Sequence, residues 1–237
     1  MSIRHAVLVL RGLAGAAAVV LLPMFTGCAS ETLLLANFNA EAIGSAPAHV
    51  QPTGTAATDA APPGSVRVVG PVAGTATNWV QIVHPDPAIP TALRGDFAQF
   101  RGDGHYGLLA AMFIPSGSGV VTLQFEPFGR PASDYLAFLH LDFMSDNSVR
   151  VDDGDTRFGT FPRDQLFTVS VQLDVLPTGT QAHFALFGSG AAGSLDYTVQ
   201  PLFQNLSRQF GAVKFWMGYP HVGQFDVDDI LVTWRKP

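Results

Sequence analysis

The stretch from Phe167 to Val175 constrains the fold more than any other part of this chain. Large apolar residues alternate there with polar ones over nine positions. The apolar members are Phe167, Val169, Val171, Leu173 and Val175, and the polar members are Thr168, Ser170, Gln172 and Asp174. Successive side chains of a β-strand point to opposite faces, so this period of two predicts a strand with one buried and one solvated face.

Short segments of the same kind recur along the chain, and turn signals separate them. They include residues 32–38, 66–69, 79–83, 106–114, 121–126, 149–151 and 157–158. An Asp-Gly pair at 153–154 predicts a hairpin, and residues 201–210 are compatible with one short helix or a turn. Many short strands, 18 Phe and 24 Gly are typical of an all-β protein. We therefore predict an antiparallel β-sandwich.

Residues 28–237 are expected to form a single domain, because all-β domains of about 200 residues commonly share one core. Residues 45–64 are rich in Pro, Ala and Thr and poor in large apolar groups. This composition predicts a flexible loop within the domain. The alternative is a linker that sets the globular part away from a membrane, but a predicted strand precedes the segment.

Residues 1–27 have the composition of an export signal. Arg4 and Arg11 give a positive flank, and an apolar run covers residues 13–25 before the small residues that precede Cys28. This order is typical of a secretory signal peptide. The run is shorter than the roughly 20 residues of a membrane-spanning helix. Cys28 is the one cysteine of the chain, so it has no partner for an internal disulfide.

The segment Phe25-Thr26-Gly27-Cys28 resembles the lipobox of bacterial lipoproteins, with Phe25 where Leu is usual. The resemblance implies that a lipid is attached to the Cys28 sulfur and that the leader is cleaved just before it. Ala29 and Ser30 follow, and the absence of Asp at the second mature position implies sorting to the outer membrane in Gram-negative members. We therefore expect a protein of the bacterial cell envelope, held to a membrane by its N-terminal lipid.

The charge balance argues against nucleic acid as a partner. Cleavage before Cys28 removes two of the 13 basic residues, which leaves 11 against 19 acidic ones and a net charge of −8. Binding to nucleic acid requires a cationic surface that replaces phosphate counterions. The overall charge also gives no attraction to anionic lipid, so membrane attachment is expected to depend on the acyl chains.

Both ends of the mature chain resemble the concanavalin A-like lectin/glucanase jelly rolls, which include laminin-G-like modules. Near the start, Asn37-Phe38-Asn39 leads to Gly44-Ser45-Ala46-Pro47, and near the end Phe225–Val232 contains Asp-Asp-Ile-Leu-Val. In the middle, residues 159–167 resemble the approach to the strand before the final hairpins. The resemblance implies that the terminal strands pair. Such folds include lectins, binding modules, glycosidases and lyases, so the fold does not name a function.

Motifs of glucanases, polysaccharide lyases and serine hydrolases are absent or incomplete in the sequence. The Glu-x-Asp-x-x-Glu string of jelly-roll glucanases is absent, and so is Gly-x-Ser-x-Gly. The lyase-like string Gln81-Ile82-Val83-His84 has one extra residue, which moves His84 to the other face of the strand. The sequence therefore favours a non-catalytic binding role, with glycan as the candidate ligand. The alternatives are a polysaccharide-active enzyme with an unrecognised site and a purely structural envelope protein.

Glycan binding would use aromatic rings that cover the apolar face of a sugar, together with polar groups that fix its hydroxyls. The candidate binding residues are the aromatics Trp79, Tyr106, Trp216 and Tyr219 and the polar pair His140 and Asp142. The same aromatic residues are equally expected in the core of a sandwich, and His140 can be an ordinary surface residue.

An acidic corner in the last strand is a candidate calcium site. Asp226 and Asp228 share one face of a strand, and a bulge at Asp228–Asp229 would bring in a third carboxylate. Calcium takes six to eight oxygen ligands, and the jelly-roll resemblance implies that a structural calcium is common. The alternative is three carboxylates that face water. Neither the ligand nor the oligomeric state follows from the sequence.

Overall fold

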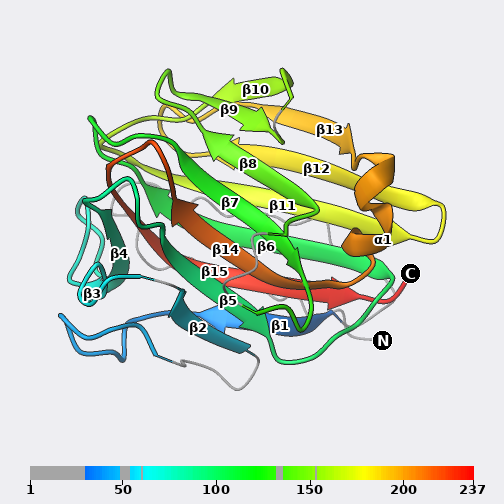
Figure 1. Cartoon of the computed structure of the whole chain (residues 1–237), viewed down its shortest axis with the longest axis horizontal. Coiled ribbons are helices and arrows are strands. Elements are labelled where there is room, and N and C mark those ends of the chain that lie inside the picture. Colours follow the sequence, from blue (N-terminus) through cyan, green and yellow to red (C-terminus); the bar gives the residue numbers. More distant parts are fainter. Residues whose placement is uncertain (1–29, 49–53, 60, 132–135, 153) are drawn as a thin grey trace, which may run out of the picture.

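The computed structural model describes residues 30–48, 54–59, 61–131, 136–152 and 154–237. These residues form fifteen strands, a single 3-10 turn, η1 (Pro201–Phe203), and one short helix, α1 (Gln204–Ser207). The strands make two antiparallel sheets packed as a sandwich (Figure 1). The predicted all-β architecture is confirmed, and of the two alternatives for residues 201–210, a short helix or a turn, the structure has η1 followed by the short helix α1.

Sheet A has eight strands in the order β13-β12-β11-β6-β15-β4-β3, and β1 also pairs with β15. Its strands are β1 (Glu31–Ala36), β3 (Val66–Val69), β4 (Trp79–His84), β6 (Gly104–Phe113), β11 (Leu166–Leu176), β12 (Gly179–Phe187), β13 (Ser194–Thr198) and β15 (Gly223–Arg235). The long strands β6, β11 and β15 lie side by side at its centre, which explains the nearly continuous apolar run of β6.

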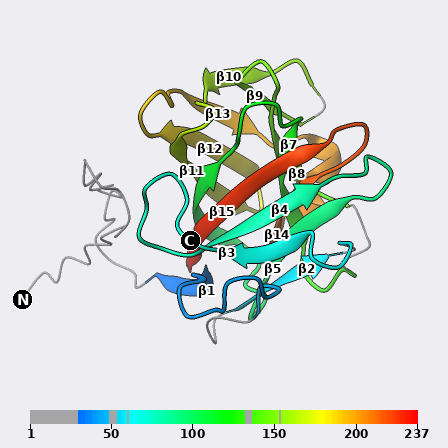
Figure 2. The ribbon, with the colours of Figure 1, turned by 90° about the vertical axis from the view of Figure 1, so that its left-hand side faces the viewer.

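Sheet B has seven strands in the order β10-β9-β8-β7-β14-β5-β2. They are β2 (Gly54–Asp59), β5 (Thr91–Phe97), β7 (Val121–Pro127), β8 (Leu139–Phe143), β9 (Ser148–Val151), β10 (Arg157–Thr160) and β14 (Phe210–Met217). Figure 2, turned by 90°, again shows β1 and β2 at one margin of the sandwich and β9 and β10 at the opposite margin.

The space between the sheets is filled with large apolar side chains, many of them Phe. Phe210 lies within 5.7 Å, centroid to centroid, of the rings of Phe97, Tyr106, Phe125 and Phe138. The apolar members of the alternating stretch in β11 are all at most 2% exposed. Burial of apolar area of this kind stabilises a domain by roughly 25 cal/mol per Å². The alternation therefore placed the core side of β11 correctly.

The structure has two of three local features predicted from the sequence and differs at the third. The terminal strands β1 and β15 are antiparallel neighbours, with Ala36 opposite Ile230. The hairpin around 153–154 is present, since β9 and β10 pair, although residue 153 itself lies outside the described residues. The loop prediction for 45–64 is wrong at 54–59, because β2 pairs with β5 along its whole length. Backbone pairing at a sheet edge does not need the large side chains that the prediction looked for.

The predicted signal peptide, residues 1–27, and the predicted lipidation site, Cys28, lie outside the described residues. Within the described part of the chain, helical structure is too short to cross a membrane. The anchor therefore stays a prediction from the sequence.

Candidate functional site

The outer face of sheet B carries a row of polar side chains on neighbouring strands. Thr122 of β7 lies opposite Asp142 of β8 and Trp216 of β14, and Gln124 lies opposite His140. Alternate positions such as Leu123 and Leu141 point into the core and are fully buried. The period of two therefore gathers these polar groups on one face.

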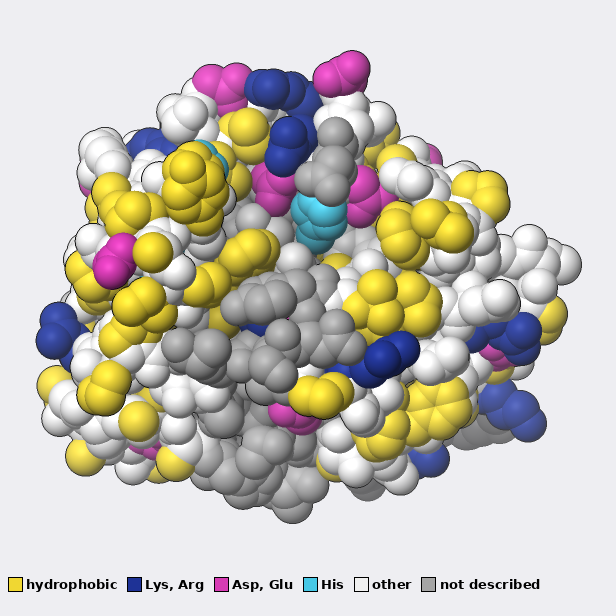
Figure 3. Space-filling view, viewed as in Figure 1, with side chains coloured by type: hydrophobic (Ala, Val, Ile, Leu, Met, Phe, Trp, Pro, Cys, Tyr) yellow, Lys and Arg dark blue, Asp and Glu magenta, His cyan; other side chains and the backbone are white. Residues whose placement is uncertain are grey.

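These residues line a cleft of about 640 Å³, which we call the sheet cleft. Its lining comes from β7, β8 and β14, the loop after β14, the end of β9 and the two ends of η1. The residues are Val120, Thr122, Gln124, Leu136, Ala137, Phe138, Leu139, His140, Asp142, Arg150, Asp152, Gln200, Phe203, Trp216, Gly218, Tyr219 and His221. Figure 3 shows this face, with histidine, acidic and basic side chains gathered around a hollow. Four of the six predicted binding residues meet here: His140, Asp142, Trp216 and Tyr219.

Asp142 is held in place by its neighbours across the sheet. Its Oδ1 accepts a hydrogen bond from the Thr122 hydroxyl at 2.7 Å. Its Oδ2 accepts from Arg150, at 2.6 Å from Nη2 and 3.1 Å from Nε. Charge-assisted contacts of this kind are strong, and they fix the carboxylate although it is only 4% exposed. These contacts fix the orientation of the Asp142 carboxylate in the lining of the sheet cleft.

His140 lies between two carboxylates. Its Nε2 is 3.8 Å from Asp142 Oδ2, and its Nδ1 is 3.6 Å from Asp152 Oδ1. Asp152 also accepts hydrogen bonds from the His140 backbone N–H, at 3.0 Å, and from the Tyr197 hydroxyl, at 2.7 Å. Burial, together with Asp152, raises the pKa of Tyr197 to about 12, so this hydroxyl remains a donor. The arrangement is a fixed array of donors and acceptors.

The border of the cleft is aromatic and open to solvent. Tyr219 follows β14 and is 80% exposed, which is unusual for a side chain of this size. Trp216 is partly exposed on the strand before it. His221 completes this border, and burial lowers its pKa, an effect that the nearby charge of Asp142 opposes. The border of the sheet cleft therefore combines an exposed aromatic ring with fixed polar groups.

A buried ionic group continues the same face beyond the cleft. Arg94 Nε of β5 is 3.2 Å from Glu126 Oε2 of β7, and Lys214 Nζ of β14 is 3.8 Å from Glu126 Oε1. All three side chains are at most 4% exposed. No motif in the sequence pointed to these residues, nor to Arg150 and Asp152. Alternation within β5, β7 and β14 puts them on the polar face, but only the strand register brings them together.

Trp79 and Tyr106 do not belong to this site, which corrects the sequence-based assignment. Both lie in sheet A and are only 2% and 3% exposed. The Trp79 indole N–H donates to Thr75 Oγ1 at 3.0 Å, and the Tyr106 hydroxyl donates to the Gly102 carbonyl. Buried Trp and Tyr usually find such partners, so these two are core residues.

The acidic corner of β15 has the predicted bulge, since the register with β6 shifts between Asp228 and Leu231 and Asp229 has a φ of 49°. Asp226 and Asp228 are only 2% and 1% exposed. The third carboxylate, that of Asp229, accepts a hydrogen bond at Oδ1 from the Asn37 side chain at 3.1 Å. In the described part of the chain, no group of three or more His, Cys, Asp or Glu residues is arranged to hold a metal ion. Calcium at Asp226, Asp228 and Asp229 stays a prediction, and other oxygen ligands would have to complete its shell.

Comparison with known proteins supports the fold. No family model and no curated protein matches the sequence. Among solved structures, an endo-1,3-β-glucanase from Streptomyces sioyaensis is similar, with a TM-score of 0.55 and 14% identity over 88% of this chain and 97% of that one. Arcelin-5, a lectin-like defense protein from Phaseolus vulgaris, has a TM-score of 0.53 and 9% identity over 88% and 99%.

A third similar structure is lectin I from Ulex europaeus in complex with the methyl glycoside of α-L-fucose. Its TM-score is 0.51, with 9% identity over 87% of this chain and 98% of the lectin. Likeness at such identities establishes the fold alone. The predicted concanavalin A-like jelly roll is therefore confirmed, and function has to be argued from the site.

Proposed function

We propose that this protein is a lipid-anchored, non-catalytic glycan-binding protein of the bacterial envelope. The observation that carries the binding role is the sheet cleft, where the exposed ring of Tyr219 stands beside the fixed polar array around Asp142. The ring covers the C–H face of a sugar, and the array accepts and donates hydrogen bonds to its hydroxyls. A ligand in the similar Ulex europaeus lectin is a fucoside, which is consistent with sugar as the ligand class.

The state of the carboxylates favours binding over hydrolysis. A glycosidase needs one carboxylic acid that protonates the leaving group and a second carboxylate that acts as nucleophile or base. Asp142 is instead paired with Arg150, and Asp152 accepts from Tyr197 and the His140 backbone. Both carboxylates are committed to contacts that hold them in fixed positions.

A polysaccharide-active enzyme is the second candidate, because His140 lies between two carboxylates in a cleft. Release of reducing sugar from a β-1,3-glucan by the native protein, abolished by Asp142→Asn, would favour this candidate over simple binding. A purely structural role would have been favoured by a polar surface without a cleft, and the sheet cleft argues against it.

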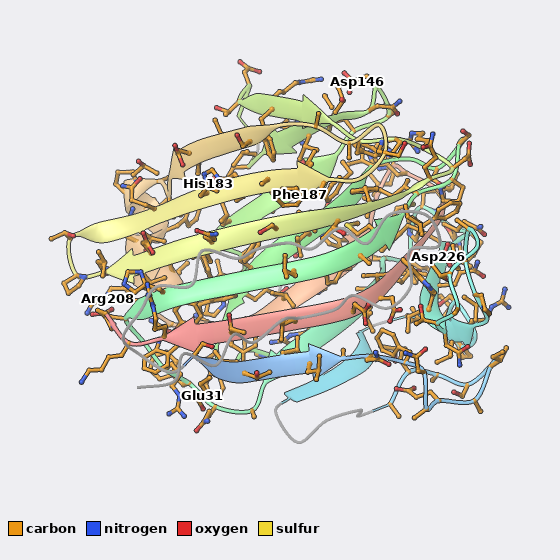
Figure 4. All side chains as sticks on the ribbon, turned by 180° about the vertical axis from the view of Figure 1, so that it is seen from behind. Glu31, Asp146, His183, Phe187, Arg208 and Asp226 are labelled. Carbon is orange, nitrogen blue, oxygen red and sulfur yellow. The ribbon has the colours of Figure 1, made fainter. Side chains whose placement is uncertain are left out.

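Tyr219→Ala is expected to weaken glycan binding about tenfold, because ring stacking contributes about 0.5–1.5 kcal/mol beyond the area that it buries. An array of neutral and acidic glycans would identify the ligand, and calorimetry would then compare the variant with the native protein. The matched control is Phe187→Ala, which removes a 40% exposed aromatic ring from sheet A, on the other side of the molecule (Figure 4).

Equal weakening by both aromatic substitutions would show that the sheet cleft is not the binding surface. Full binding by Tyr219→Ala would contradict the role of this ring directly.

Cys28→Ser is expected to release the protein from the membrane or to leave it with its leader uncleaved, because the lipid is attached to this sulfur in the family that residues 25–28 resemble. Fractionation of the expressing cells and mass spectrometry of the native N-terminus measure the two effects. An unmodified Cys28 in the membrane fraction would refute the anchor.

A further inference from the structure

One end of the sandwich exposes two aromatic rings beside each other. Phe100 is 46% exposed and Phe128 is 41% exposed, and their ring centroids are 5.8 Å apart. Phe100 borders a shallow depression between the loop 98–103 and the end of β15. Contiguous apolar surface is unfavourable in water, and exposed apolar patches commonly mark interaction surfaces.

Basic side chains share the depression with Phe100, although the chain as a whole is acidic. Arg101, Arg208 and Lys236 line the same depression, together with the acidic residue Asp103. Arg101 pairs with Glu31, and Arg208 pairs with Asp103 at 2.8 Å. We call Phe100, Arg101, Phe128, Arg208 and Lys236 the tether-end patch. Basic and hydrophobic side chains also adjoin at the right-hand end of Figure 3.

The described part of the chain begins beside this patch. β1 begins at Glu31, opposite Trp234 of β15 and in contact with Arg101. Cys28 is three residues before Glu31, so even a fully extended chain places it within about 10 Å. Figure 4 shows Glu31 and Arg208 at one end of the sandwich and Asp226 at the other. A lipid on Cys28 therefore holds the tether-end patch close to the headgroups, within about one Debye length.

We propose that the tether-end patch docks on the anionic lipid surface in which Cys28 is anchored. This inference rests on the lipid anchor of the proposed function. The rings of Phe100 and Phe128 enter the headgroup boundary, and the basic side chains lie at the phosphates. The acidic remainder of the chain is repelled by the same surface, which reinforces this orientation.

The orientation has a consequence for the sheet cleft. The strands run along the long axis of the sandwich, away from the end that carries the tether-end patch. The sheet cleft lies on the outer face of sheet B, the face turned toward the viewer in Figure 1. The cleft then opens sideways, along the membrane plane. A glycan that lies parallel to the membrane reaches Tyr219 without passing under the protein.

Depth measurement on the lipidated protein tests this inference. The full chain is produced in a bacterium with Lys236→Cys, purified in its lipidated form and reconstituted in vesicles of phosphatidylethanolamine and phosphatidylglycerol. A fluorescent dye is attached to the introduced cysteine. Brominated lipid quenches its fluorescence when the labelled position lies at the bilayer. The matched control is Ala88→Cys, an exposed position in the loop between β4 and β5, at the other end of the sandwich.

Strong quenching at Lys236→Cys with none at Ala88→Cys is the expected result. Adding Phe100→Ser and Phe128→Ser should remove most of the quenching and leave the melting temperature unchanged, since both rings are exposed. Flotation with the vesicles reports the anchor separately. Flotation with equal quenching at both positions, or with quenching at Ala88→Cys alone, would overturn the docking and leave the anchor standing. Failure to float would overturn both.

Discussion

Val171→Asp is expected to unfold the protein, whereas Thr168→Asp should leave it folded. Val171 is 1% exposed at the centre of sheet A, opposite Leu108 of β6 and Phe184 of β12. A carboxylate there has no partner, and an unpaired buried charge costs several kcal/mol. Native domains have only about 5–15 kcal/mol of net stability. The variant should therefore lose the cooperative thermal transition that far-UV circular dichroism records for the native protein.

Thr168 lies on the same strand but on its outer face, opposite Ala111 and Phe187. Its side chain is partly exposed, so a carboxylate at this position stays hydrated. Thr168→Asp should change the free energy of unfolding by about 1 kcal/mol or less. A loss of folding in both variants would show that β11 is covered on both faces. Stable folding of Val171→Asp would contradict the position of the core.

Much of the fold followed from the sequence because its strongest signal is local. The alternation in β11 needs only neighbouring residues to show which side is buried, and the structure buries that side. β2 was not predicted, because its sequence carries no such local signal. Its residues, Gly54–Asp59, lack large apolar side chains, and its place at the edge of sheet B depends on backbone pairing with β5.

The candidate site was predictable in part, for a related reason. Alternation identifies the face of a strand, so His140 and Asp142 were found together. It does not show whether a loop covers that face, and Trp79 is covered through its contact with Thr75. Arg150 and Asp152 join the site through the pairing of β8 with β9, and no local pattern in the sequence specifies that register.

The stability of the protein in the presence of a chelator is expected to fall between about pH 5 and pH 7.5. Burial raises the pKa of both Asp226 and Asp228 from 3.8 to about 7. At Asp228 the charge of Asp229 adds to the effect of burial and a hydrogen bond with Thr77 opposes it. At Asp226 a hydrogen bond with Gln81 opposes the effect of burial. Because the folded state keeps these protons after the unfolded state has released them, the free energy of unfolding decreases as the pH rises.

The decrease is at most about 1.4 kcal/mol for each pH unit and each carboxylate. His221 acts in the opposite direction, because its pKa is lowered on folding and its contribution grows as the pH rises. The variant Asp226→Asn with Asp228→Asn isolates the acidic pair, since both amides are neutral at every pH. It should flatten the decrease and melt at a higher temperature than the native protein at pH 8.

Asp146→Asn is the matched control for this measurement. Asp146 is 57% exposed, and hydrogen bonds from Ser148 lower its pKa. Its contribution to stability is present above the unfolded pKa and is lost only as the pH falls below about 4. The control should therefore leave the slope between pH 5 and pH 7.5 unchanged. A native protein with a flat profile in this range would contradict the raised pKa values of the β15 pair.

Calcium should reverse this pH dependence if it binds at Asp226, Asp228 and Asp229. The ion requires ionised carboxylates, so it competes with protons and stabilises the folded state more at pH 8 than at pH 5. At a hundredfold excess over its dissociation constant the gain is about 2.7 kcal/mol, or several degrees in melting temperature. Asp228→Asn should remove the stabilisation by calcium. In the presence of chelator the same variant should be more stable than the native protein, so the two effects have opposite signs. Identical melts with calcium and with chelator at both pH values would refute the calcium site, and the fall in stability with pH would then belong to two buried carboxylates alone.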